Sequence, residues 1–246
     1  MPSRATLITD ETYARLRDLI VSNVLRAGQK LVDRDLAEAL GVSRTPIREA
    51  LGRLAMTGLI EQRARRGYYV CHFTVDQVID LYEFRKMLET HSIALAARNA
   101  KPAHLREFEA ILSEFKLLTG DPKDHARAVK LDVDIHRLIA LAAANNSLQM
   151  AMENVLDKLT CFVSVEIDGR SALKVAYDEH EQMYEYVKNK DEAGASALML
   201  KHIDNAERTL VRLFEARNAL QRSILGSRQK RIGASNRSGK MNEPIE

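Results

Sequence analysis

Apolar residues recur at helical spacing through the first part of the chain, and two strand-like runs follow them. Apolar positions three or four residues apart predict amphipathic helices at 10–24, 33–40 and 43–57. Short apolar and β-branched runs at 59–63 and 68–72 predict two strands joined by a basic turn. The order helix, helix, short turn, helix, hairpin predicts a winged helix-turn-helix.

Two details of this first segment make specific expectations. The first helix is expected to bury a stripe formed by Leu16, Leu19, Ile20 and Val24. The third helix is expected to begin at Ser43, whose hydroxyl can cap the free N–H groups there.

The remainder of the chain up to residue 222 keeps the helical period and shows no strand pattern. It predicts helices at 74–99, 102–119, 122–144, 147–167, 171–189 and 191–220. Thr74 and Gln77 have the spacing of a capping box, which would start the first of them. The fold class is therefore mainly α, with an N-terminal winged helix-turn-helix and a C-terminal all-helical bundle of six or seven helices. The predicted parts are a flexible leader at 1–9, the winged domain at 10–72, a linker at 73–75, the bundle at 76–222 and a disordered tail at 223–246.

The charge of the chain is unevenly distributed. Residues 1–73 hold 12 Lys or Arg against 8 Asp or Glu, a net +4, whereas residues 74–222 hold 20 against 24, a net −4. A basic N-terminal part suggests a polyanion as its partner, although a solvated basic face would have the same composition. No apolar run could span a membrane, no signal peptide is recognisable, and Cys71 and Cys161 form no CxxC motif. These features predict a cytoplasmic protein with reduced thiols.

The basic residues of the winged domain gather where a DNA-binding surface would need them. The buried stripe of the third helix leaves Arg44 and Arg48, four residues apart, together on the opposite face, with Thr45 beside them. Arginine can donate two hydrogen bonds to guanine in the major groove, and hydroxyls reach phosphates. Arg65 and Arg66 would occupy the hairpin tip. Each arginine taken singly is more often a solvated surface residue, but the combination predicts DNA binding.

Four polar residues interrupt the apolar stripes of the bundle. Asp132 and His136, four residues apart, share one helical face, and His180 and His202 each lie within the stripe of a later helix. Burying them without partners would cost several kcal/mol in sum, and a divalent transition metal such as Zn, Ni, Mn or Fe would satisfy all four. The alternative is that each is a separately hydrogen-bonded core residue. For four such residues the metal is the favoured interpretation, because bundles build metal sites from facing helices.

Arg85 lies inside the apolar stripe of the 74–99 helix, and two interpretations remain open. It could serve as the counter-charge for an anionic ligand near the metal. It could equally form an i,i+4 ion pair with Glu89.

Residues 33–57, DRDLAEALGVSRTPIREALGRLAMT, and the wing GLIEQRARRGYYV resemble the DNA-binding domain of the GntR family of bacterial regulators. The family usually has Pro-Gly before the second helix, where this chain has Ala27 and Gly28. The resemblance places DNA-contacting residues at Arg34, Ser43, Arg44, Thr45, Arg48 and Gly67.

Residues 76–220 resemble the FCD ligand-binding domain of the FadR branch of the same family. The metal-site pattern of that domain matches the four residues Asp132, His136, His180 and His202. This resemblance implies a metal-assisted site for a small organic acid, with Arg85 at a recurrent arginine position. It also implies a homodimer that binds a palindromic double-stranded operator.

The favoured function is therefore a ligand-controlled transcription factor, with repression favoured over activation, and not an enzyme. The alternative is a metal-dependent, hydrolase-like enzyme that uses the His and Asp residues to activate water. The chain has no HExxH motif and no evident pair of general base and nucleophile, and the winged helix has no role in that alternative. A third possibility is a module that uses the winged helix for protein contacts.

Overall fold

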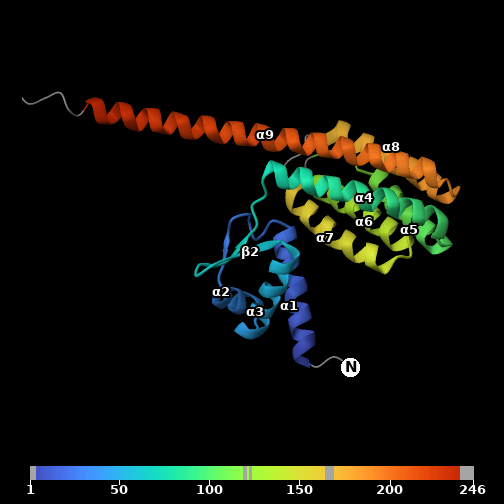
Figure 1. Cartoon of the computed structure of the whole chain (residues 1–246), viewed down its shortest axis with the longest axis horizontal. Coiled ribbons are helices and arrows are strands. Elements are labelled where there is room, and N and C mark those ends of the chain that lie inside the picture. The colour runs from blue at the N-terminus through green and yellow to red at the C-terminus, as the bar shows by residue number, and fades with distance from the viewer. Residues whose placement is uncertain (1–3, 119–120, 122–123, 164–168, 239–246) are drawn as a thin grey trace, which may run out of the picture.

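The computed structural model describes residues 4–118, 121, 124–163 and 169–238, which form a small winged domain beside a larger helical domain (Figure 1). The elements of the winged domain are α1 (Arg4–Val21), β1 (Lys30–Leu31), α2 (Asp33–Leu40), α3 (Arg44–Thr57), β2 (Ile60–Arg63) and β3 (Gly67–Val70). Those of the helical domain are α4 (Val75–Asn99), α5 (Pro102–Lys116), α6 (His125–Ala142), α7 (Asn146–Val163), α8 (Gly169–Lys188) and α9 (Glu192–Ser238). The predicted fold class is confirmed. None of the described helices is long and apolar enough to cross a membrane.

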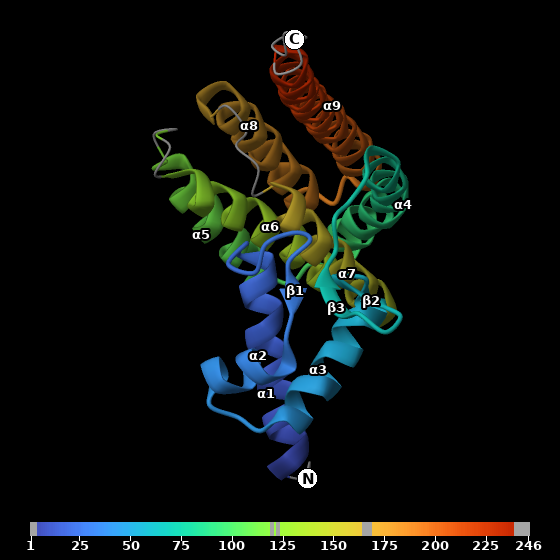
Figure 2. The same ribbon diagram turned by 90° about the vertical axis from the view of Figure 1, so that its left-hand side faces the viewer.

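The core of the winged domain is formed where α1 packs across α3 (Figure 2). Leucine and isoleucine side chains from α1, α3 and the start of β2 fill it, because their spacing places them on the inner faces of these elements. The largest fully buried members are Leu16, Ile47, Leu51, Leu54, Leu59 and Ile60. Gly41 ends α2 with φ +68, a left-handed conformation that glycine adopts without strain, so the chain turns directly into α3.

The wing is part of a three-stranded antiparallel sheet in the order β1-β3-β2. Its register pairs Ile60 with Val70 and Arg63 with Gly67, so the two strands predicted from the sequence are present in shorter form. The two-residue strand β1 has no counterpart in the prediction, because two residues are too few to display an alternating pattern. Ser43 occupies the N-cap of α3, but its hydroxyl makes no capping hydrogen bond there, contrary to the expectation.

The first helix lies earlier along the chain than predicted. It begins at Arg4, so the predicted leader at 1–9 is wrong for residues 4–9; residues 1–3 lie outside the described part. Contacts with α3 explain the extension, since Thr9 donates to Glu49 at 2.8 Å and Asp10 accepts from Arg53 at 2.6 Å. Sequence periodicity carries no signal of such contacts.

The end of the first helix is also misplaced in the prediction. Because α1 ends at Val21, Val24 follows the helix and is 62% exposed, so its predicted burial is wrong. Leu16 and Ile20 of the same predicted stripe are buried, and Leu19 packs partly buried against them.

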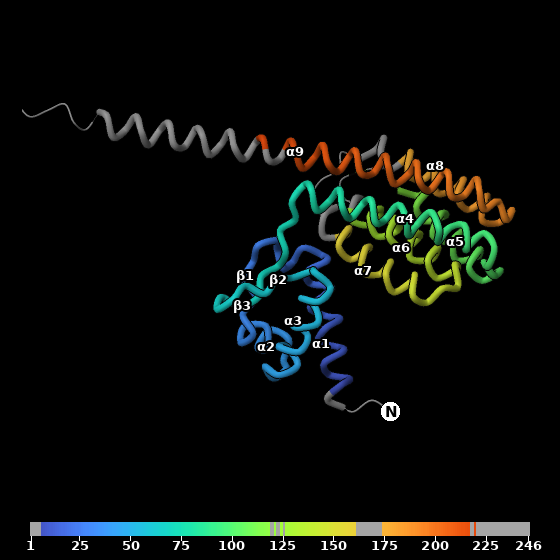
Figure 3. Tube along the Cα trace, viewed as in Figure 1, coloured from blue at the N-terminus to red at the C-terminus, as the bar shows by residue number. Residues whose placement is uncertain are grey.

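The helical domain is a bundle in which α4 lies along the first half of α9 (Figures 1 and 3). The predicted capping box starts α4: the N–H of Gln77 donates to Thr74 Oγ1 at 3.3 Å, and the Thr74 N–H donates to Gln77 Oε1 at 3.0 Å. The largest fully buried side chains of this domain are Tyr82, Ile93, Leu131, Ile135, Met152 and Leu156.

The last helix is longer than predicted. The chain remains helical to Ser238, so the predicted disordered tail at 223–246 is wrong for residues 223–238, and residues 239–246 lie outside the described part. The segment contains no proline. The glycines at 226 and 233 each cost about 1 kcal/mol relative to alanine, which weakens a helix without ending it.

The two domains meet through α7 and α1. Arg17 on α1 forms a two-armed ion pair with Asp157 on α7, in which Nε donates to Oδ2 at 2.5 Å. The next residue, Lys158, reaches the end of α3, where a Cβ on Gly58 would lie 3.3 Å from its Cε. Consecutive residues of one helix therefore contact both α1 and the C-terminal end of α3.

Substitutions in α3 test the core of the winged domain. Leu54→Ala removes a side chain that is 0% exposed, and we expect it to lower the free energy of unfolding by about 2–5 kcal/mol. Met56→Ala is the matched control, because Met56 is 81% exposed, and it should change stability by no more than about 0.5 kcal/mol. Urea denaturation followed by circular dichroism measures both. Equal effects of the two substitutions would contradict this assignment of the core.

Candidate functional site

The outer face of α3 presents the side chains predicted to contact DNA. Arg44, Thr45 and Arg48 are exposed, as is Ser43 at the start of the helix, because the inner face of α3 is occupied by the buried leucine and isoleucine residues. Arg34 is exposed in the first turn of α2, with a side chain that is 78% accessible. These residues are therefore accessible on α2 and α3, as side chains that contact a duplex must be.

An acidic residue that the sequence interpretation did not single out joins the two arginines of α3. Asp33, the first residue of α2, accepts from Arg44 Nη2 at 2.8 Å and from Arg48 Nε at 2.8 Å. Hydrogen bonds from the two guanidinium groups lower the pKa of the Asp33 carboxyl. Asp33 belongs to α2 and the two arginines to α3, so no pattern within one helix relates them, and only the packing of α2 against α3 reveals this contact.

The wing presents the remaining predicted DNA-binding residues. Arg65, Arg66 and Gly67 are exposed at the tip of the β2–β3 hairpin. Gly67 has φ +93, a conformation that favours glycine and allows the tip to turn back into β3. Arg63 stacks over the ring of Tyr69, with its Cζ 4.2 Å from the centroid. The tip is therefore a small basic protrusion of the hairpin.

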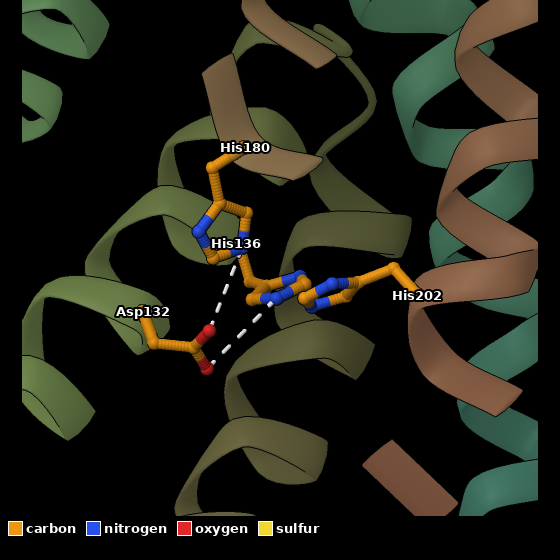
Figure 4. Close-up of side chains that lie close together, drawn as sticks. All are labelled: Asp132, His136, His180 and His202. Carbon is orange, nitrogen blue, oxygen red and sulfur yellow. Dashed lines mark ion pairs between the residues drawn. The ribbon is translucent and has the colours of Figure 1, made fainter. Parts of the chain in front are cut away.

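The four predicted metal ligands come together at one point inside the helical domain (Figure 4). Asp132 and His136 come from α6, His180 from α8 and His202 from α9, and one ligand atom from each lies within 4.8 Å of the others. The three imidazoles are buried, whereas the Asp132 side chain keeps 33% of its exposure. Ligand atoms held about 2.1 Å from one metal lie about 3–4.2 Å apart, so a small contraction of this cluster would suffice.

His180 provides the strongest indication that the cluster suits a metal. Neither of its ring nitrogens has a hydrogen-bond partner within the described structure, although the ring is fully buried. Its Nε2 lies 3.5 Å from Asp132 Oδ1. Burial, followed by the neighbouring His202, lowers the pKa of His180 well below its usual value. The ring is consequently neutral at neutral pH and has a lone pair to offer, as a metal ligand requires.

The other two imidazoles are oriented by carboxylates outside the cluster. His136 Nδ1 is hydrogen-bonded to Glu89 Oε2, and His202 Nδ1 lies 2.8 Å from Glu179 Oε2. Carboxylates in this position typically fix the tautomer of a metal-binding histidine and leave Nε2 free for the ion. The sequence interpretation did not assign either carboxylate to the site. Glu89 could have been found there, because it continues the buried stripe of α4.

Arg85 occupies the wall of the cluster. Its guanidinium is buried, pairs with Glu89, and places Nη2 3.2 Å from His136 Nε2. Burial disfavours ionisation of Glu89, but Arg85 and His136 outweigh it and lower the pKa of Glu89 to about 2. The ion pair that the sequence left open is therefore formed, but it lies in the interior rather than at the surface. Arg85 also borders the ligand cluster, so the pairing does not exclude a role as the counter-charge of an anionic ligand.

The comparisons with known proteins agree across both domains. Residues 8–70 match the gntR family of bacterial regulatory proteins, and residues 80–205 match the FCD domain. The chain is 30% identical over 218 residues to the HTH-type transcriptional regulator LutR of Bacillus subtilis, covering 80% of this chain and 98% of LutR. It is 29% identical over 189 residues to the Nta operon transcriptional regulator of Aminobacter aminovorans, covering 75% and 86% of the two chains.

The fold is also that of a solved structure. The structure of E. coli McbR/YncC superposes with a TM-score of 0.73 at 20% identity, covering 87% of this chain and all of that one. The matched families and the relatives named above are regulators, and nothing supports the hydrolase-like alternative. The chain therefore belongs to the gntR family of bacterial regulatory proteins and carries an FCD domain behind its winged helix-turn-helix.

Proposed function

We propose that this regulator binds a palindromic DNA operator as a homodimer and releases it when a small carboxylate binds beside a divalent transition metal in the helical domain. The observation that carries the proposal is His180, a buried imidazole without a hydrogen-bond partner among the described residues, inside a cluster of three histidines and one aspartate. Repression is the simpler mode for a protein whose effector weakens operator binding. A cytoplasmic location accords with this role and stays a prediction.

The residues proposed to read the operator are Arg44, Thr45 and Arg48 in the major groove, with Arg34 and Ser43 on phosphates. Arg65, Arg66 and Gly67 of the wing would approach the adjacent phosphates or minor groove. The exposure of this whole set supports the assignment. A two-fold dimer would place two such surfaces on two half-sites of a palindrome.

In the helical domain, Asp132, His136, His180 and His202 would hold the metal, and the metal would supply a Lewis-acidic position for a carboxylate oxygen. Glu89 and Glu179 would orient two of the imidazoles. Arg85 is proposed as the counter-charge of the effector, which requires its guanidinium to turn from His136 when the metal is bound. Sugar acids, dicarboxylates and hydroxy acids are the classes to test.

Replacement of Arg44 tests the DNA-binding surface. Arg44→Ala should weaken binding to an operator selected from random duplexes by about 5- to 150-fold, because a two-armed arginine–guanine contact contributes about 1–3 kcal/mol. Arg53→Ala is the matched control in the same helix, since Arg53 pairs with Asp10 of α1 on another face. Fluorescence anisotropy gives both dissociation constants. No binding of any duplex by the unaltered protein, or equal losses in both variants, would refute the assigned surface.

Thermal unfolding with a panel of small carboxylates, with and without a chelator, tests the metal-assisted site. An effector at 100 times its dissociation constant should stabilise the protein by about 2.7 kcal/mol, and chelation or His136→Ala should remove the shift. His91→Ala is the control, because His91 is an exposed histidine on α4. Metal content measured by mass spectrometry should fall in the first variant and not in the second. If chelation changes nothing and no acid shifts the transition, the cluster is structural.

Two arginines of α4 allow a buried ion pair, Arg85 with Glu89, to be compared with an exposed ion pair, Arg98 with Glu192. Arg85→Met leaves Glu89 buried beside a neutral side chain, so we expect a loss of about 3–5 kcal/mol in the free energy of unfolding. Arg98→Met breaks the exposed pair with Glu192 and should leave stability nearly unchanged, because water screens an exposed ion pair. Chemical denaturation measures both. A cost below about 1 kcal/mol for Arg85→Met would show that Glu89 does not depend on it.

A further inference from the structure

The contacts of Asp33 constrain both arginines proposed to read the operator. Its Oδ2 accepts from Arg44 Nη2 at 2.8 Å and from Arg48 Nε at 2.8 Å, and Arg44 Nε lies 3.2 Å from the same oxygen. The Asp33 side chain is 23% exposed, whereas the arginine side chains are 55% and 63% exposed. One carboxylate at the start of α2 thus holds two long side chains of α3 in a fixed relation.

The bonds made to Asp33 use the Nε edges of the guanidinium groups. Arg44 offers Nε and Nη2, and Arg48 offers Nε. A guanine edge accepts two parallel N–H bonds from one guanidinium. An arginine held at its Nε edge can still present its terminal nitrogens to a base, and part of the entropy lost on ordering the side chain is lost before DNA arrives.

The charge of Asp33 has a second effect on the same surface. Non-specific binding to a duplex comes almost entirely from phosphates contacted by basic side chains. A carboxylate between two arginines offsets part of their positive charge and repels phosphates that approach it. Contacts to a base edge depend on direction as well as charge, so they benefit from the fixed orientation. The carboxylate therefore weakens binding to any sequence and favours the correct one.

We propose that Asp33 is a positioning residue that sets the sequence discrimination of this protein, by orienting Arg44 and Arg48 for guanine and by lowering their attraction to phosphates. The inference rests on the proposed DNA-binding function. It predicts that removing the carboxylate strengthens non-specific binding while weakening the preference for the operator.

Asp35 supplies a matched control. It stands in the same first turn of α2, so its charge interacts with the helix N-terminus as that of Asp33 does. Its ion pair is with Arg34, at 3.1 Å, and not with the arginines of α3. Asp33→Asn and Asp35→Asn therefore remove one negative charge each from the same helix end, and they differ in which arginines they release.

The test measures the dissociation constants of the full-length protein for three duplexes, over a range of salt concentrations. The duplexes are an operator selected from random sequences, the same operator with one guanine of each half-site replaced, and a scrambled sequence. For Asp33→Asn we expect about tenfold less discrimination between the first two duplexes, a difference of about 1.4 kcal/mol. Binding to the scrambled duplex should tighten. The slope of its logarithmic binding constant against the logarithm of the salt concentration should become steeper by about the amount that one phosphate contact contributes.

The controls decide the interpretation. Asp35→Asn should shift the three duplexes together and leave their ratios unchanged, and Asp33→Glu, which keeps the charge, should recover part of the discrimination. Thermal unfolding establishes whether each variant is folded. If Asp33→Asn does not fold, the comparison of Asp33→Glu with the unaltered protein provides the test. Equal ratios in Asp33→Asn and the unaltered protein would overturn the role of Asp33 while leaving DNA binding intact. Absence of binding to every duplex by the unaltered protein would overturn the proposed function itself.

Discussion

The burial of ionisable groups at the centre of the helical domain is the constraint on which the rest of that domain depends. Charged and imidazole side chains lose their hydration there, and each must find a partner inside the protein. Arg85, Glu89 and His136 satisfy one another across α4 and α6, and Glu179 satisfies His202 across α8 and α9. These helices must therefore keep their mutual positions, because separating them would leave buried charged and imidazole groups without partners.

Among the described residues of this interior, the paired side chains contrast with His180. His180 lies among the paired groups and has no hydrogen-bond partner of its own within the described structure. Burying an imidazole without a hydrogen-bond partner costs free energy that an apolar residue at the same position would not. The combination of a costly polar interior and an imidazole without a hydrogen-bond partner among the described residues is the feature on which the proposed metal site rests.

The sequence predicted those features that depend on periodicity and missed those that depend on pairing. The stripes of apolar residues located the helices and placed Asp132 and His136 on one face of α6. The partnership of Glu89 with His136 joins residues 47 positions apart, and that of Asp33 with Arg48 joins residues 15 apart, so no local pattern contains them. The helix ends were misplaced for a similar reason, because α1 is extended by contacts of Thr9 and Asp10 with α3.

The contact between the domains gives the helical domain a means of holding the winged domain at one angle. Asp157 is buried against Arg17, and the neighbouring Lys158 lies against the end of α3, so a rotation of the winged domain must separate both contacts. A ligand can drive such a rotation only through its stronger affinity for the rotated form. Reversing a 99:1 preference for the docked arrangement would require an affinity ratio of about 10,000, or about 5.5 kcal/mol. Under the proposed function, these two contacts together would thus set how large that affinity ratio must be.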